Sequence, residues 1–245
     1  KIVKALLRHL PENVEVIVDH DAKGTLTAGT AGDSGMVLIA GTGSIAYTFP
    51  AQGTAPSRIG GWGYLLGDEG SGYDIGRKAI ATVMKAYDGR SASTKLTALL
   101  LSHFDQKDEG ELIPLIYGEK DVRGYVASAA PLVFEAAEQQ DKVAKRILRE
   151  ARADLFSLVE QGYHDLPENA AKVLVLNGGL FQNTQFKLAL KKMLKRSFSH
   201  LKIIEPSVSS EAGAYMAALQ RKQIRLTNSI VTRIRETENG REGTC

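Results

Sequence analysis

The sequence predicts an α/β fold, because short apolar runs typical of buried strands alternate with segments of helical periodicity. Strand-like runs lie at 36–40, 45–49, 172–177 and 202–205. The 245 residues exceed the roughly 150 of an average domain, so the chain holds one to two domains and can bury a core. Of the 24 glycines, 15 fall between Gly24 and Gly89, which predicts loops that surround a ligand.

In the N-terminal part, apolar spacing and glycine turns define each expected element. We expect a helix over 1–10, a strand over 14–19, a helix over 22–30 and two strands over 36–40 and 45–49. Only four residues, 41–44, join the last two strands, so they form a hairpin.

The remainder of the chain is mainly helical by its pattern. A glycine-rich loop over 60–71 precedes a helix that ends near Tyr87, and apolar residues at three and four spacing make 94–166 a helical subdomain without strands. The elements expected after it are a strand at 172–177, a helix from Asn183, a strand at 202–205, a helix at 209–219 and a polar tail.

Composition excludes several classes of protein. The chain has 31 basic and 28 acidic residues, 24% charged and 43% hydrophobic residues, values that exclude a disordered chain. No apolar run approaches the roughly 20 residues of a membrane span. The pI of 8.8 reflects lysine and arginine scattered over helices without interleaved aromatic residues, so we expect neither a nucleic-acid nor a membrane partner.

The single cysteine, Cys245, excludes a disulfide framework, a cysteine-ligated zinc and a cysteine-held iron–sulfur cluster within one chain. No leader with a charged and then an apolar segment marks the chain for export. We therefore expect a cytoplasmic location.

Two features after predicted strands carry candidate chemistry. Asp21 follows the run at 14–19, where a carboxylate can take a proton from a hydroxyl group; alternatively it caps the helix at Ala22. Gly41-Thr42-Gly43-Ser44 offers amides and hydroxyls to a phosphate, although a hairpin turn alone also explains two glycines. The turn matches neither a Walker loop nor a dinucleotide-binding fingerprint.

The segment Gly60-Gly61-Trp62-Gly63-Tyr64 to Gly67-Asp68-Glu69-Gly70-Ser71 mixes an aromatic ring with adjacent acids. Aromatic rings pack on sugar faces and carboxylates bind hydroxyl pairs, so the segment suits a polyhydroxylated ligand. The alternative places Trp62 in the core and uses one acid to cap the helix at Ser71. We call residues 60–71 the sugar loop.

Two further glycine-containing segments predict different roles, one in ligand binding and one in helix packing. The Gly178-Gly179 turn after the strand at 172–177 lets backbone lie against a flat base, although α/β proteins also use glycine pairs in turns that bind no ligand. Gly213 lies among alanines, a small helix face that permits close packing or a hinge.

Together these segments resemble the sugar kinase, heat-shock protein and actin superfamily, and within it the N-acetylglucosamine kinase group of the BadF/BadG/BcrA/BcrD ATPase family. The resemblance covers 14–219 and is strongest over 60–71. It implies an actin-like ATPase (ribonuclease H-like) fold, with a largely complete second lobe that contains a helical subdomain. The implied divisions are a first-lobe remnant with a connecting helix (1–31), the second lobe (32–208), a second connecting helix (209–224) and a peripheral tail (225–245).

The resemblance also implies an ATP- and Mg²⁺-dependent kinase that phosphorylates the 6-hydroxyl of an amino sugar, with Asp21 as catalytic base and no metal-ligating residue assigned. The implied sugar-binding residues are Ser44, Ile45, Gly61, Trp62, Gly63, Tyr64 and Asp68. The implied ATP-binding residues are Gly41, Thr42, Gly43, Ala127, Gly178, Gly179 and Asn183. Ile45 replaces an asparagine of animal members, so N-acetylglucosamine, N-acetylmuramic acid and glucosamine all remain candidate substrates.

Family members carry an Asp-Gly-Gly-Gly-Thr-like phosphate hairpin that this sequence does not contain. We therefore expect a truncated first lobe and weak turnover by these 245 residues alone. Two other functions remain open: an activator ATPase of 2-hydroxyacyl-CoA dehydratases and a non-catalytic sugar or nucleotide sensor. A homodimer is also possible.

Overall fold

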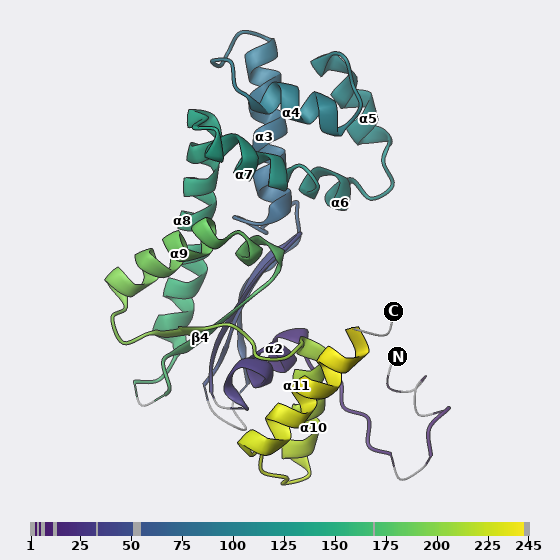
Figure 1. Cartoon of the computed structure of the whole chain (residues 1–245), viewed down its shortest axis with the longest axis vertical. Coiled ribbons are helices and arrows are strands. Elements are labelled where there is room, and N and C mark those ends of the chain that lie inside the picture. Colours follow the sequence, from purple (N-terminus) through teal and green to yellow (C-terminus); the bar gives the residue numbers. More distant parts are fainter. Residues whose placement is uncertain are drawn as a thin grey trace. The chain divides into compact units, whose positions relative to one another are not determined.

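The computed structural model describes residues 3, 5, 8–11, 14–32, 34–50, 55–168 and 170–242. The chain forms two compact units (Figure 1). Unit 1 comprises Lys1–Gly32 with Pro206–Cys245, and unit 2 comprises Asp33–Glu205.

Unit 2 is built on a five-stranded sheet of order β3-β2-β1-β4-β5. The strands are β1 (Gly35–Ala40), β2 (Ser44–Phe49), β3 (Ser57–Gly60), β4 (Val173–Asn177) and β5 (Lys202–Ile204). The predicted hairpin is confirmed, since β1 and β2 pair antiparallel and end on the partners Ala40 and Ser44. Strand β3 was not predicted, because its first residues are polar and exposed and so give no apolar run.

The helices of unit 2 confirm the predicted helical middle segment. They are α3 (Gly72–Tyr87), α4 (Leu96–His103), α5 (Leu112–Gly118), α6 (Val122–Ala127), α7 (Ala130–Glu138), α8 (Lys142–Asp165) and α9 (Thr184–Ser197), with 3₁₀ turns η1 (Glu109–Glu111) and η2 (Gly179–Gln182). Helices α3 to α7 gather beyond the end of the sheet, whereas α8 runs alongside it (Figure 1).

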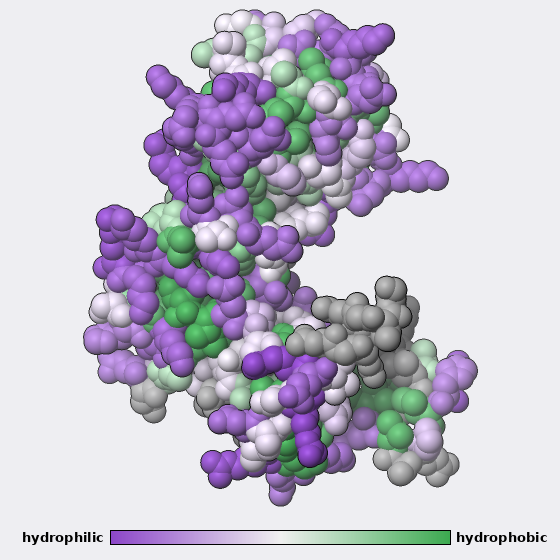
Figure 2. Space-filling view, viewed as in Figure 1, coloured by the Kyte–Doolittle hydropathy of each residue, from purple (hydrophilic) through white to green (hydrophobic). Residues whose placement is uncertain are grey.

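Helix α8 lies close to the sheet because Gly162 has no side chain. A Cβ there would lie 3.1 Å from the Met36 sulfur and 3.1 Å from the Thr48 methyl carbon. The resulting core joins sheet residues such as Leu38 and Leu176 to Leu155 of α8. On the face shown in Figure 2, hydrophilic side chains cover most of the helices of unit 2, with smaller hydrophobic areas between them.

Parallel pairing of β1 and β4 brings two glycine turns to one edge of the sheet. Ile39 pairs with Asn177, so the chain leaves both strands side by side at Gly41 and Gly178. Gly178 has φ +112°, and a Cβ there would lie 2.3 Å from the carbonyl oxygen of Ala40. Glycine is therefore required at this position.

Unit 1 centres on the helices α2 (Asp21–Thr30) and α10 (Ser210–Arg221). A Cβ on Gly213 would lie 2.0 Å from the carbonyl oxygen of Gly24, which confirms the predicted packing role of this small-residue face. The helix α11 (Asn228–Glu242) follows. Its Val231 and Ile234 pack against the cluster of Ala28, Val208 and Met216. Helix α11 was not predicted, because this part of the sequence was expected to form a polar tail.

One predicted element is wrong, and another lies half outside the described residues. Residues 14–19 form no strand, and Val14, Ile17 and Val18 are exposed. A strand needs a hydrogen-bonding neighbour, and the described part of unit 1 contains no other strand. Half of the residues of the helix expected over 1–10 lie outside the described residues. Among the described helices, none combines the length and apolar character that crossing a bilayer requires.

Candidate functional site

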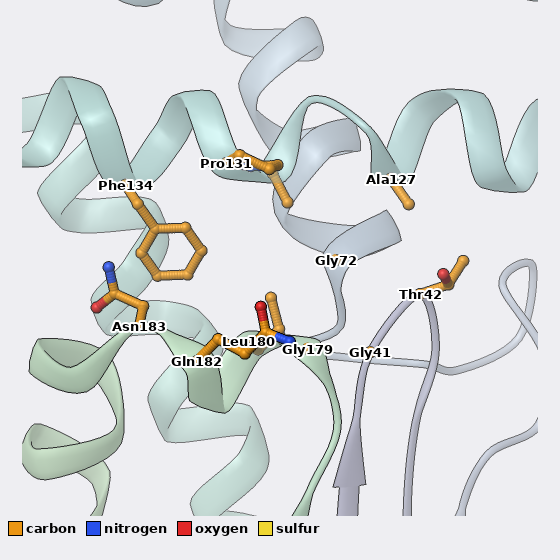
Figure 3. A pocket seen from close by; sticks show the side chains of 11 residues that line it. Gly41, Thr42, Gly72, Ala127, Pro131, Phe134, Gly179, Leu180, Gln182 and Asn183 are labelled. Atoms are coloured by element: carbon orange, nitrogen blue, oxygen red, sulfur yellow. The ribbon is translucent and has the colours of Figure 1, made fainter. Parts of the chain in front are cut away.

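Unit 2 contains a cavity of about 600 Å³ at the edge of the sheet where β1 and β4 end. The β1–β2 turn, the start of α3, the end of α6, the start of α7 and η2 surround it (Figure 3). Its lining residues are Gly41, Thr42, Gly72, Ala127, Ala130, Pro131, Phe134, Gly179, Leu180, Gln182 and Asn183.

Five residues predicted to bind ATP line this cavity together, although they come from segments far apart in the sequence: Gly41, Thr42, Ala127, Gly179 and Asn183. In Figure 3, Phe134 and Asn183 lie at one end, Thr42 and Ala127 lie at the other, and Gly179 lies between them. A Cβ on Gly179 would meet no atom within 4 Å, so its missing side chain leaves space in the cavity. The two other residues predicted to bind ATP, Gly43 and Gly178, are not among the lining residues but are adjacent in sequence to Thr42 and Gly179.

The β1–β2 turn directs its carbonyl groups to protein donors. The carbonyl oxygens of Gly41 and Thr42 accept the N–H groups of Gly72 and Tyr73, at 2.8 and 3.1 Å. The carbonyl oxygen of Gly43 accepts the Gly41 N–H at 2.9 Å. Because these oxygens are already bonded within the protein, repulsion of an anionic phosphate near the Thr42 hydroxyl is reduced.

Sequence reasoning missed the apolar wall of the cavity, above all Phe134 and Pro131 on α7. Phe134 packs edge to face on the buried Phe186, with ring centroids 5.5 Å apart. Its periodicity marked it as one helix residue among many, so no local signal separated it from the core. At the same end, the Asn183 side chain accepts the N–H of Phe186 and thereby caps α9.

The sugar loop adopts a backbone that depends on glycine. Gly60, Gly61, Gly63 and Gly70 all have positive φ. Trp62 is 62% exposed, which excludes the alternative that it belongs to the core. The guanidinium of Arg58 lies 3.9 Å from the centre of its ring. The other alternative is also excluded, since Ser71 itself caps α3 by accepting the N–H of Asp74.

Two predicted sugar-binding side chains lie inside the protein between the β1–β2 turn and the sugar loop. The Ser44 hydroxyl is buried and donates to the carbonyl oxygen of Glu69 at 2.7 Å. Asp68 is buried at φ +59° and accepts a hydrogen bond from Arg123. Ile45 lies under Gly61, where a Cβ would meet its Cδ1 at 2.4 Å. The turn and the loop are therefore tied to each other directly.

Tyrosines and an acid stabilise the junction between the loop and α3. Tyr64 packs edge to face on Tyr73 with centroids 5.1 Å apart. Burial raises the pKa of Tyr73, so its hydroxyl stays protonated. The Asp74 carboxylate accepts the N–H of Gly70 at 3.1 Å and pairs with Lys78 at 2.7 Å, which anchors the end of the loop.

Asp21 begins α2 in unit 1 and is exposed. Its Oδ1 accepts the N–H of Ala22 at 2.8 Å. The alternative that Asp21 caps the helix is wrong, because His20 occupies the cap position and Asp21 is the first residue of α2. Since a carboxylate with one N–H donor keeps further acceptor sites, this contact is compatible with a role as base.

The cavity lining offers hydroxyl, amide and backbone groups but no carboxylate. Within the described residues, no group of three acidic, histidine or cysteine side chains is arranged to hold a metal ion. Kinase sites commonly bind Mg²⁺ through one or two carboxylates together with the nucleotide phosphates, and the residues that line this cavity supply no such carboxylate.

Comparison with known proteins places the chain among kinases of sugars. The model of the BadF/BadG/BcrA/BcrD ATPase family matches residues 1–220. The chain is 36% identical to the N-acetylmuramic acid/N-acetylglucosamine kinase of Clostridium acetobutylicum over 219 residues, covering 89% of this chain and 71% of the relative. It is 32% identical to the N-acetyl-D-glucosamine kinase of Dictyostelium discoideum, covering 87% and 68%.

Solved structures confirm the predicted fold class. A protein of Chromobacterium violaceum, provisionally assigned as an N-acetylglucosamine kinase, is 28% identical with a TM-score of 0.69 and covers 89% of this chain and 70% of its own. A ROK family glucokinase from Streptomyces griseus, solved with glucose and AMPPNP, shares the fold at 17% identity and a TM-score of 0.55, covering 86% and 70%. The fold is the actin-like α/β fold of sugar kinases, and the chain belongs to the BadF/BadG/BcrA/BcrD ATPase family.

Proposed function

We propose that this protein is an amino-sugar kinase that transfers the γ-phosphate of ATP to the 6-hydroxyl of N-acetylglucosamine, N-acetylmuramic acid or glucosamine. The observation that carries the proposal is the cavity of about 600 Å³ that gathers five predicted ATP-binding residues from three separate segments. The curated relatives, whose names are those of amino-sugar kinases, support the same reaction class.

The cavity suits a nucleotide at both ends. Phe134 and Pro131 provide an apolar surface for the adenine ring, and Asn183 lies beside them. Thr42 and the glycine turn lie at the opposite end, where the phosphates would extend toward the sugar loop. The bare backbone at Gly41 and Gly179 leaves room between the two ends.

In the reaction, the sugar O6 attacks the γ-phosphorus, a new P–O bond forms, and the bond to the bridging oxygen of ADP breaks. The Asp21 carboxylate takes the proton of the 6-hydroxyl. Asp68, Trp62 and the rest of the sugar loop hold and orient the sugar. Mg²⁺, when bound to the phosphates, neutralises their charge.

The test is phosphorylation of each of the three amino sugars by the full-length protein with Mg-ATP, followed by NMR of the product. We expect a sugar 6-phosphate, and we expect Asp21→Asn to lower kcat by roughly a hundredfold or more while sugar affinity is kept. Failure to phosphorylate any of the three would contradict the proposal, and an unchanged kcat would remove Asp21 from the role of base.

Two competing functions give different results. A sensor would bind sugar or nucleotide without turnover, and an activator ATPase would contain iron held between subunits. The kinase names of the relatives favour neither. The Mg²⁺ requirement, the cytoplasmic location and the homodimer remain predictions.

A further inference from the structure

Arg123 of α6 forms an ion pair with a carboxylate of the sugar loop. Its Nη2 lies 3.1 Å from Oδ2 of Asp68. The Asp68 side chain is 4% exposed, whereas that of Arg123 is 42% exposed. A carboxylate so far removed from water takes its orientation from its cationic hydrogen-bond partner.

The ion pair lies against the bare backbone of the β1–β2 turn. A Cβ on Gly43 would lie 2.1 Å from Nη2 of Arg123 and 2.9 Å from Oδ2 of Asp68. The absence of a side chain at position 43 therefore makes room for the pair, beside Thr42 on one side and Ser44 on the other.

The helix that carries Arg123 also forms part of the nucleotide cavity. Helix α6 runs from Val122 to Ala127, and Ala127 lines the cavity. The helix lies directly on α3, because a Cβ on Gly76 would meet the carbonyl oxygen of Val126 at 2.1 Å. Because α6 is closely packed, a shift of its backbone at Arg123 would also move Ala127 in the cavity wall.

Arg123 also has a donor that the protein does not satisfy. Its Nε is buried, and no described residue accepts a hydrogen bond from it. An unmet buried donor costs free energy, so a small movement that gives it an acceptor is favoured. A sugar bound beside Asp68 brings such acceptor oxygens.

We propose that Arg123 is a positioning residue that orients Asp68 for the sugar hydroxyls and couples sugar binding to nucleotide binding through α6. This inference rests on the proposed kinase function. It predicts that each ligand strengthens binding of the other, by a factor of about 5 to 150, and that this factor depends on Arg123.

Calorimetric titration of the full protein tests the inference. N-acetylglucosamine, N-acetylmuramic acid and glucosamine are each titrated with and without saturating AMPPNP. For Arg123→Gln we expect sugar affinity about tenfold weaker, affinity for AMPPNP alone within about twofold of wild type, and a coupling factor near one. Arg123→Lys should recover part of the sugar affinity, because it keeps the charge.

Two controls separate positioning from folding. Arg90→Gln breaks another arginine–aspartate pair, with Asp88 at the exposed end of α3, and should behave as wild type. In an Asp68→Asn background, Arg123→Gln should have no further effect on sugar affinity, because Arg123 acts through Asp68. This double variant leaves no buried carboxylate without a cation, so it tests the inference even if the single variant folds poorly.

The outcomes are distinct. Wild-type protein that binds neither sugar nor AMPPNP overturns the proposed function and this inference together. Wild-type protein that binds both, with Arg123→Gln indistinguishable from Arg90→Gln, overturns only the role of Arg123. Independent effects of the two substitutions in the double variant would likewise overturn it.

Discussion

The glycines between the two helices of unit 1 and the glycines that line the cavity of unit 2 lack a side chain for opposite reasons. In unit 1, a Cβ on Gly24 would meet the carbonyl oxygen of Ser210 at 2.4 Å, so glycine lets two helices touch. In unit 2, a Cβ on Gly179 would meet nothing within 4 Å, and one on Gly41 would only approach the nitrogen of Gly179 at 4.0 Å. Gly24 therefore serves packing, whereas Gly41 and Gly179 keep space open in the proposed nucleotide cavity.

The largest stability effect is expected where a glycine touches backbone. Gly213→Ala should lower the free energy of unfolding by about 2 kcal/mol or more, because the added methyl cannot fit against the carbonyl oxygen of Gly24. Helix propensity alone would favour alanine by about 1 kcal/mol, so a net loss reports the clash. Denaturant unfolding measures it, with Gly118→Ala, which meets no atom within 4 Å, as control. Equal stability of the two variants would refute the packing role.

A smaller effect is expected at Asp141, which caps α8 in unit 2 away from the cavity. Burial alone would raise the pKa of Asp141, but hydrogen bonds from the N–H groups of Ala144 and Lys95 and from the Thr94 hydroxyl lower it below 3.8. Asp141→Asn should cost about 1 kcal/mol at neutral pH, since the amide accepts these bonds less strongly.

The sign of the pH dependence follows from the lowered pKa. The carboxylate of Asp141 contributes stability above its ordinary pKa of 3.8, and this contribution is lost as the pH falls through the lower native value. The difference between wild type and Asp141→Asn should therefore shrink in acid. The exposed cap Asp108, replaced by asparagine, is the matched control. A difference that grows on acidification would contradict the assignment.

The sequence predicted the parts of the fold whose signal is local. The apolar runs of β1, β2 and β4 and the capped starts of α3 and α9 each carry their own pattern. Residues 14–19 carry the same kind of apolar pattern, yet they form no strand, because a strand also needs a neighbour to pair with.

The candidate site divides in the same way. Gly41, Thr42 and Gly179 stand out because each lies in a glycine turn directly after a predicted strand, and they do meet in the cavity. No comparable local sequence pattern distinguishes Phe134 and Arg123 from other helix residues. Their importance comes from partners about 50 residues away in the sequence, Phe186 and Asp68, which only the fold brings near.

The most direct test of the account is titration of AMPPNP into wild-type protein and the Gly179→Leu variant. Because a side chain at position 179 enters open space, the free energy of unfolding should stay within about 0.5 kcal/mol of wild type. The same side chain occupies the proposed nucleotide cavity, so affinity should fall by about tenfold or more, whereas Gly118→Leu should bind as wild type. A stable Gly179→Leu variant that binds AMPPNP with unchanged affinity would contradict the claim that this cavity is the nucleotide site.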